Sequence, residues 1–162
     1  MKGSARPDPT FFIDADLSDE LFHTVLTQTG VRYEKHADHF AAGTDDLVWL
    51  QRAGENGWIV LSHNRKIRNN SAQTDRLMQY GVRAFMLIGD PYPNPPGQRS
   101  AFTTELAQNF VRTLPSVLRF LRRHPGPWIA KLYRPGVTTA LKDPPPGTIK
   151  MWLTMQQWLK ER

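Results

Sequence analysis

Short apolar runs alternate along the chain with stretches in which apolar residues recur at helical spacing. The runs FFID (11–14), WIVLS (58–62), VRAFMLI (82–88) and WIAKLY (128–133) are expected to be strands, with another inside VRYEKHADHF (31–40). WIVLS is apolar almost throughout, which is typical of strands covered on both faces. The pattern therefore predicts buried strands rather than half-exposed ones.

Helical spacing links these runs. Helices are expected after residue 17 up to Gly30, from Thr44 to about Gly57, over residues 71–80, and over residues 100–123 with a kink or a break at Pro115. Strands that alternate with helices predict an α/β fold, a central parallel sheet of about five strands with helices on both faces.

Three segments are expected along the chain. Residues 1–10 are a proline-containing leader, residues 11–134 form the domain, and residues 135–162 form a C-terminal extension ending in a short amphipathic helix. That helix would carry Trp152, Met155 and Leu159 on one face. It either packs back on the domain or docks a partner, because an exposed apolar stripe is unfavourable in water.

Composition narrows the class of protein. The chain of 162 residues suits one domain, and its lack of cysteine excludes disulfides, thiol nucleophiles and zinc–thiolate sites. Neither a membrane span nor a signal peptide is visible, so we expect a cytoplasmic protein. The net charge of +6 and the pI near 9.9 favour polyanions such as nucleic acid, although many small proteins are basic.

Polar groups are predicted to gather at one edge of the sheet. Asp14 ends the first strand, Asp46 opens the helix before the third strand, and Asn64 follows that strand. Ligands bind beyond the carboxyl ends of parallel strands, and oxygen ligands suit Mg²⁺ or Mn²⁺. Acids at these places are also common as helix caps, and Asp45 is interpreted as one.

The order of four motifs resembles the compact PIN-like nuclease domains, including the VapC-like toxins of toxin–antitoxin pairs. These motifs are FFIDADL, TDDLVWLQRA, GWIVLSHNRKI and GVRAFML, and the resemblance runs from about residue 11 to residue 134. The residues that match the family pattern are Asp14, Asp16, Leu17, Asp46, Ala53, Ser62, His63, Asn64, Arg65, Ala84 and Phe85.

The resemblance implies a three-layer α/β/α fold and a metal-dependent endoribonuclease. Asp14, Asp46 and Asn64 would be the catalytic positions and would hold Mg²⁺ or Mn²⁺, although the family usually has Asp where this chain has Asn64. An amide oxygen can ligate a hard cation but adds no charge. Asp16 is a secondary ligand, because strand alternation is expected to direct it away from Asp14.

Positive charge surrounds Asn64 in the segment SHNRKIRNN. We expect His63, Arg65, Lys66 and Arg68 to bind RNA phosphates, or else to form a solvated basic turn. Arg112, Arg119, Arg122 and Arg123 give a basic helix face that suits solvent, RNA or an acidic partner segment.

Other residues favour ordinary structural roles. Ser62 and His63 are adjacent on a strand end and point apart, which disfavours a hydrolase triad. His36 and His39 are more typical of surface residues than of metal ligands, and Trp49 and Trp58 of core aromatics.

Two functions remain open. One is a toxin ribonuclease restrained by a small antitoxin protein, with a homodimer implied by resemblance. The alternative is a catalytically degenerate PIN-like domain that binds RNA or protein, a reading that Asn64 favours.

Overall fold

The architecture is a mixed six-stranded sheet between two layers of helices, and it confirms the predicted α/β class. It is seen in a computed structural model that describes residues 8–17, 20–64, 66–88, 99–133 and 147–161, with only the backbone described at 99–104. The strands are β1 (Thr10–Ile13), β2 (Arg32–Lys35), β3 (Ile59–Ser62), β4 (Arg83–Ile88), β5 (Trp128–Tyr133) and β6 (Thr148–Thr154). Their order is β2-β1-β3-β4-β5-β6, and only β6 is antiparallel to its neighbour.

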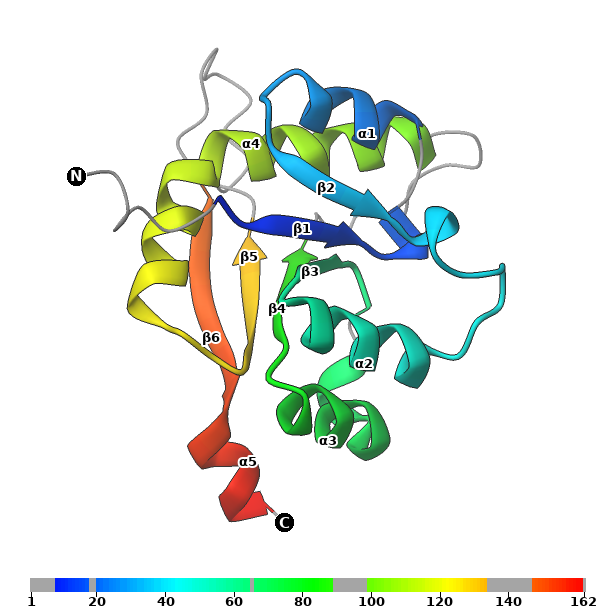
Figure 1. Cartoon of the computed structure of the whole chain (residues 1–162). Coiled ribbons are helices and arrows are strands. Elements are labelled where there is room, and N and C mark those ends of the chain that lie inside the picture. The colour runs from blue at the N-terminus through cyan, green and yellow to red at the C-terminus, as the bar shows by residue number, and fades with distance from the viewer. Residues whose placement is uncertain (1–7, 18–19, 65, 89–98, 134–146, 162) are drawn as a thin grey trace, which may run out of the picture.

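Helices cover both faces of this sheet (Figure 1). The α-helices are α1 (Glu20–Thr27), α2 (Asp46–Asn56), α3 (Ser71–Gln79), α4 (Arg99–Arg123) and α5 (Met155–Glu161), and 3₁₀ turns occur at η2 (Ala15–Leu17), η3 (His36–Asp38) and η4 (Ile67–Asn69). Helices α1 and α4 pack on one face, and α2, α3 and α5 lie on the other. None of the helices in the described part of the chain has the length and apolar content needed to cross a membrane.

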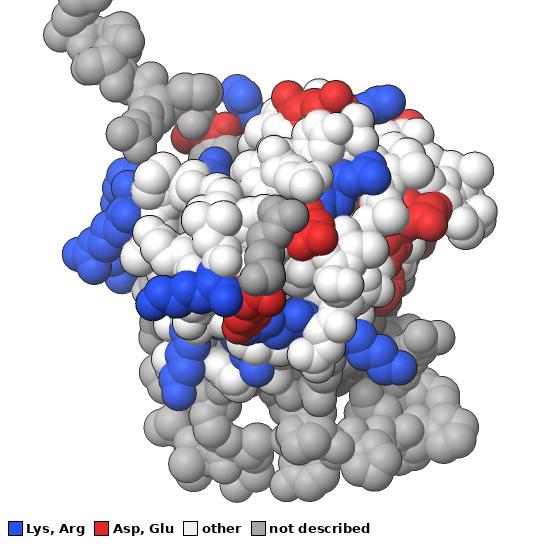
Figure 2. All heavy atoms as spheres, turned by 90° about the horizontal axis from the view of Figure 1, so that it is seen from below, with Lys and Arg blue, Asp and Glu red and all other residues white. Residues whose placement is uncertain are grey.

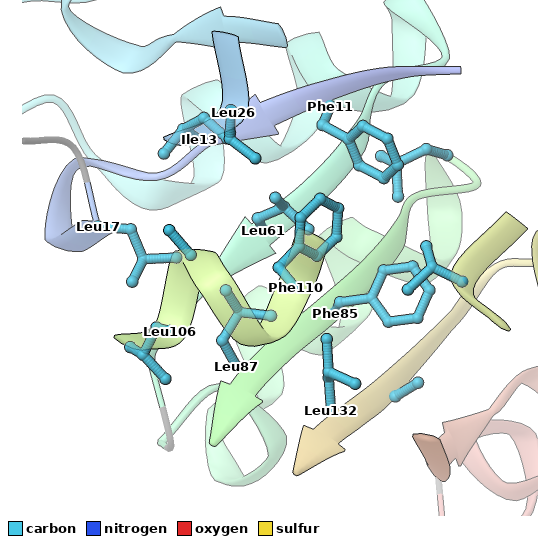
Figure 3. Close-up of a cluster of buried hydrophobic side chains, with 14 of the residues drawn as sticks. Phe11, Ile13, Leu17, Leu26, Leu61, Phe85, Leu87, Leu106, Phe110 and Leu132 are labelled. Atoms are coloured by element: carbon cyan, nitrogen blue, oxygen red, sulfur yellow. The ribbon is translucent and has the colours of Figure 1, made fainter. Parts of the chain in front are cut away.

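Strand alternation divides the apolar side chains between two cores. The row Phe12, Val60, Ala84, Ile129 and Leu153 crosses the sheet in register and faces α2 and α3. The neighbouring row faces α1 and α4, where Phe110 packs edge-on against Phe11 (Figure 3). Burial on both faces explains why the strands read as continuous apolar runs.

Two helices bear on the sequence prediction. Helix α4 runs through Pro115 without a break, and Pro115 lies on its exposed side while Phe110 and Val117 are buried in the core. Helix α2 ends at its C-cap Gly57, as predicted, with a φ of 69°, and Gly54 lies inside the helix. A Cβ atom at Gly54 would collide with the Tyr80 carbonyl oxygen, so this glycine permits close packing of α2 on the end of α3.

The C-terminal segment is another correction. We expected a helix carrying Trp152, but residues 148–154 form the edge strand β6, and Trp152 belongs to it. The register pairs Leu153 with Ile129, so this stretch extends both apolar cores instead of forming a helix face. In α5 the buried side chain is Trp158, while Leu159 is 57% exposed. The segment therefore packs back on the domain.

We expect Trp158→Ala to lower the free energy of unfolding by about 3 kcal/mol. The change removes a buried ring and the 2.7 Å hydrogen bond from Trp158 Nε1 to Asp75 Oδ1 on α3. Urea denaturation of both variants checks this, with Leu159→Ala as a control expected to change stability by less than about 0.5 kcal/mol. Equal losses in the two variants would contradict the docking of α5 through Trp158.

Candidate active site

The site begins where β1 and β3 end side by side. Ile13 pairs with Leu61, which brings the next residues, Asp14 and Ser62, together at the carboxyl edge. Both follow the alternation that directs Phe12 and Val60 toward the α2/α3 face. Ser62 Oγ donates a 2.8 Å hydrogen bond to Asp14 Oδ2, and the Ala15 amide donates to Asp14 Oδ1.

Asp16 lies beside Asp14, which corrects the expectation that it points away. Residues two apart in a strand share a face, so alternation does not separate Asp14 from Asp16. In addition, strand β1 ends at Ile13, and Asp16 belongs to the 3₁₀ turn η2. The His63 amide donates to Asp16 Oδ2 at 3.2 Å, and the charge of Asp16 raises the pKa of Asp14, so the two carboxyl groups lie close together. Asp14 and Asp16 therefore form a carboxyl pair.

Burial and mutual repulsion keep this pair protonated to unusually high pH. The pKa of Asp14 is raised to about 7, chiefly by burial and also by the charges of Asp16 and Asp46, and the hydrogen bonds from Ser62 and Ala15 offset part of this rise. The pKa of Asp16 is raised to about 6, chiefly by desolvation and also by the charge of Asp46, and the His63 hydrogen bond offsets part of this rise. Among the described residues, no cation contributes to either pKa shift, and a carboxyl pair of this kind favours a bound cation.

Asp46 faces the pair from the first turn of α2. Asp45 is the N-cap, as predicted, and accepts a hydrogen bond from the Leu47 amide, which leaves the side chain of Asp46 available to the site. Trp49 Nε1 donates to Asp46 Oδ1 at 2.9 Å, and Gln73 Nε2 donates to Asp46 Oδ2 at 3.0 Å. Both carboxylate oxygens of Asp46 are thus held by protein donors.

Asn64 lies in the turn after β3. Its amide donates to Ser62 Oγ at 3.1 Å, and its side-chain oxygen accepts from the Lys66 amide at 3.0 Å. Its side-chain nitrogen lies 3.5 Å from Gln73 Oε1. A continuous polar network therefore joins Asp14 to Asp46 through Ser62, Asn64 and Gln73.

The donor chemistry of the site fits a hard divalent cation. All candidate ligands offer oxygen, and Asp14 and Asp16 lack a positive partner within the network. However, no three His, Cys, Asp or Glu residues in the described ranges converge closely enough to hold a metal ion. The acidic centre is thus a pair, with Asp46 at a longer electrostatic range.

The predicted phosphate-binding residues fall in different environments. His63 Nδ1 lies 2.8 Å from the Leu87 carbonyl, and Lys66 is exposed beside Asn64. Arg68 points toward the C-terminal helix, where its guanidinium binds both carboxylate oxygens of Glu161 at 2.7 and 3.1 Å. Arg65 lies outside the described residues.

Other candidate chemistry is not supported by the geometry. Ser62 donates to Asp14, and His63 contacts a backbone carbonyl, so the two do not form a nucleophile–base pair. His36 is buried, contrary to the surface role expected for it, and His39 pairs with Glu34 at 3.0 Å. Trp49 is buried and Trp58 stacks on Phe12 at 5.4 Å, which confirms both as core aromatics.

Three contributors to the site were missed from the sequence: Gln73, the indole of Trp49 and Glu161. A Gln in the first turn of a helix has the pattern of a solvated residue. The indole was assigned to the core, which is correct for its ring but omits its N–H. Glu161 is 93 residues from Arg68 in sequence, and such a distant ion pair has no local signal.

Comparison with known proteins gives the family. The model for the PIN like domain matches residues 9–89, half of the chain's 162 residues, and the chain belongs to this family. It is also similar to a Mycobacterium tuberculosis protein named "Putative ribonuclease VapC45", with 23% identity over 122 residues that cover 73% of this chain and 81% of the relative. No solved structure gives a significant match.

The raised pKa values predict a loss of stability with rising pH in metal-free buffer. In the folded protein the pKa of Asp14 is about 7 and that of Asp16 is about 6, whereas both have the ordinary value of 3.8 in the unfolded chain. Between pH 3.8 and about pH 7 the folded state therefore binds more protons than the unfolded state. The free energy of unfolding should fall as pH rises through this window. Asp14→Asn removes one buried charge and should raise the free energy of unfolding at pH 8 by about 1–2 kcal/mol.

Urea denaturation with EDTA at pH 5 and pH 8 measures this difference. Glu55→Gln, at the exposed far end of α2, is the control and should keep the wild-type pH dependence. A wild type whose stability is flat over this range would show that Asp14 is not buried beside Asp16 as described.

Proposed function

We propose that this chain is a metal-dependent endoribonuclease, the cytoplasmic toxin of a toxin–antitoxin module. The observation that carries the proposal is the buried carboxyl of Asp14 at the carboxyl edge of the sheet, with the exposed Asp16 beside it and the charge of Asp46 close enough to raise the pKa of both. Membership of the PIN-like family and similarity to a protein named as a ribonuclease support the same activity.

Asp14 and Asp16 would hold Mg²⁺ or Mn²⁺, with Asp46 and Asn64 beside it. Such an ion, when bound, supplies charge neutralisation at the scissile phosphate and activates water. The protein's part is to keep the ligands in place. Ser62 orients Asp14 through its hydroxyl, and the His63 amide orients Asp16. Groups that hydrogen-bond to metal ligands in this way set the orientation and the basicity of those ligands.

The substrate would approach over the turn that follows β3. Lys66 is exposed there, and we assign RNA phosphate binding to Lys66, His63 and Arg65. Arg68 would join them when released from Glu161, because one guanidinium cannot satisfy a carboxylate and a phosphate in the same bidentate geometry.

A catalytically degenerate RNA- or protein-binding module is the second candidate. The observation favouring it is that Asn64 brings no charge and its side-chain oxygen is already engaged by the Lys66 amide. A lost carboxylate weakens attraction for a cation, so substrate phosphate would have to complete the site.

Charge distribution supports an anionic partner, either RNA or an acidic segment of an antitoxin. Arg112, Arg119, Arg122 and Arg123 are exposed on α4, and none forms an ion pair with a carboxylate in the described ranges. On the face at the α5 end, acidic and basic side chains are interspersed (Figure 2), so this face has no single-sign patch. We therefore place the partner-binding charge on α4 and the β3 turn, and a homodimer remains compatible with this arrangement.

Releasing Arg68 should strengthen RNA binding. Glu161→Gln removes the carboxylate that occupies the Arg68 guanidinium, and we expect RNA affinity to rise roughly two- to fivefold at low salt. Glu55→Gln, which removes an equal charge from an exposed site on α2, is the control. Fluorescence anisotropy with single-stranded RNA measures both. An equal gain in the two variants would indicate only a net-charge effect.

Cleavage of a mixed RNA pool with Mg²⁺ or Mn²⁺ tests the activity. We expect wild type to cut, and we expect Asp14→Asn with Asp46→Asn to cut at least about 100-fold more slowly, because the cation loses its charged ligands. Glu55→Gln is again the matched control.

Asn64→Asp separates the two candidate functions. Cutting by Asn64→Asp but not by wild type would assign the chain to the degenerate class, disarmed at one position. RNA binding without cutting by any variant would also reject the enzyme and leave the binding module.

A further inference from the structure

Gln73 is the one side chain that contacts both Asp46 and Asn64 among the described hydrogen bonds. Its Nε2 donates to Asp46 Oδ2 at 3.0 Å, and its Oε1 faces Asn64 Nδ2 at 3.5 Å. The first contact joins an N–H to a carboxylate at good length and is the stronger one, while the second is at the long limit for a hydrogen bond. A single amide thereby spans two polar groups that come from α2 and from the β3 turn.

The position of Gln73 is itself fixed by local structure. Asn70 is the N-cap of α3, and its side chain accepts from the Gln73 amide at 3.1 Å. Farther along α3, Arg76 donates to Leu47 O at 3.3 Å and to Gln51 Oε1 at 2.8 Å, both on α2. These contacts join α2 to α3 independently of Gln73, so the position of Gln73 beside Asp46 does not rest on its own hydrogen bond alone.

Asp46 is gripped on both oxygens. Trp49, one turn along the same helix, holds Oδ1, and Gln73, from the neighbouring helix, holds Oδ2. Trp49 is buried, so its indole N–H has little freedom to move away. The orientation of the Asp46 carboxylate is therefore set by two protein donors.

We infer that Gln73 is a positioning residue that orients the Asp46 carboxylate. We also infer that the side-chain amide of Asn64 allows Gln73 to do so, because its N–H faces the Gln73 side-chain oxygen. An Asp at position 64 would place a carboxylate oxygen against Gln73 Oε1, where Asn64 now offers an N–H. Gln73 would then have to turn, and turning removes its donor from Asp46. The metal-binding consequence of this inference rests on the proposed function, whereas the positioning of Asp46 does not.

The nuclear magnetic resonance signal of the Trp49 indole N–H tests the positioning without metal or RNA. The indole donates to Asp46, so its resonance reports where that carboxylate lies. Gln73→Met keeps the length of the side chain and removes both contacts, and it should shift this signal. Gln51→Met is the matched control, because it removes another amide contact between α2 and α3 but none to Asp46. Trp49→Phe assigns the signal.

Asn64→Asp tests the matching of the two amides. It should shift the Trp49 signal in the wild-type background, but much less in the Gln73→Met background, because the route from residue 64 to Asp46 runs through Gln73. An equal shift in both backgrounds would overturn the matching.

Calorimetry with Mn²⁺ measures the consequence for metal binding. Gln73→Met should weaken affinity about tenfold, as expected for a lost partner of a ligand, and Gln51→Met should leave it within about twofold. If wild type binds no Mn²⁺ but Gln73→Met still shifts the Trp49 signal, the proposed function fails and the positioning role stands. An unchanged Trp49 signal in Gln73→Met overturns the inference, whether or not the protein cuts RNA.

Discussion

The hydrogen bond from Ser62 to the buried carboxyl of Asp14 is the interaction on which the site depends. A carboxylate that is only 7% exposed is costly to ionise, and it is paired with a second one in η2. Two donors, the Ser62 hydroxyl and the Ala15 amide, offset part of that cost. The remainder is offset by the two apolar cores, which fix the ends of β1 and β3 in register.

The acidic and the amide side chains around Asp14 have different roles. Asp14 and Asp16 concentrate negative charge, whereas Asn64 and Gln73 add hydrogen bonds without charge. A carboxylate at position 64 would strengthen attraction for a cation and would also add repulsion to a cluster in which burial already raises two pKa values. Compared with Asp at this position, Asn64 lowers the attraction for a cation but forms hydrogen bonds with the Lys66 amide and with Gln73.

The fold was largely predictable, because the strands are buried on both faces and so appear as continuous apolar runs. The site was predictable only as far as chain order allows: Asp14 and Asn64 follow strand ends, Asp46 opens a helix, and Asp45 caps that helix. The direction of Asp16 was wrong because alternation was misapplied and the strand ends before it. Strand β6 was missed because Trp152 and Met155 also fit helical spacing, and only pairing with β5 decides between the two.

The sixth strand explains why a distant segment belongs to the description of the site. Strand β6 leads into α5, which packs against α3. There Trp158 donates a hydrogen bond to Asp75, and Glu161 forms an ion pair with Arg68. These two contacts lie on either side of the start of α3, and Gln73 lies between the residues they hold. Movement of α5 would therefore change two things together: the availability of the Arg68 guanidinium, and the support of the turn of α3 that orients Asp46. The C-terminal helix therefore contacts, at Arg68 and Asp75, the same short segment that carries Gln73, which binds Asp46.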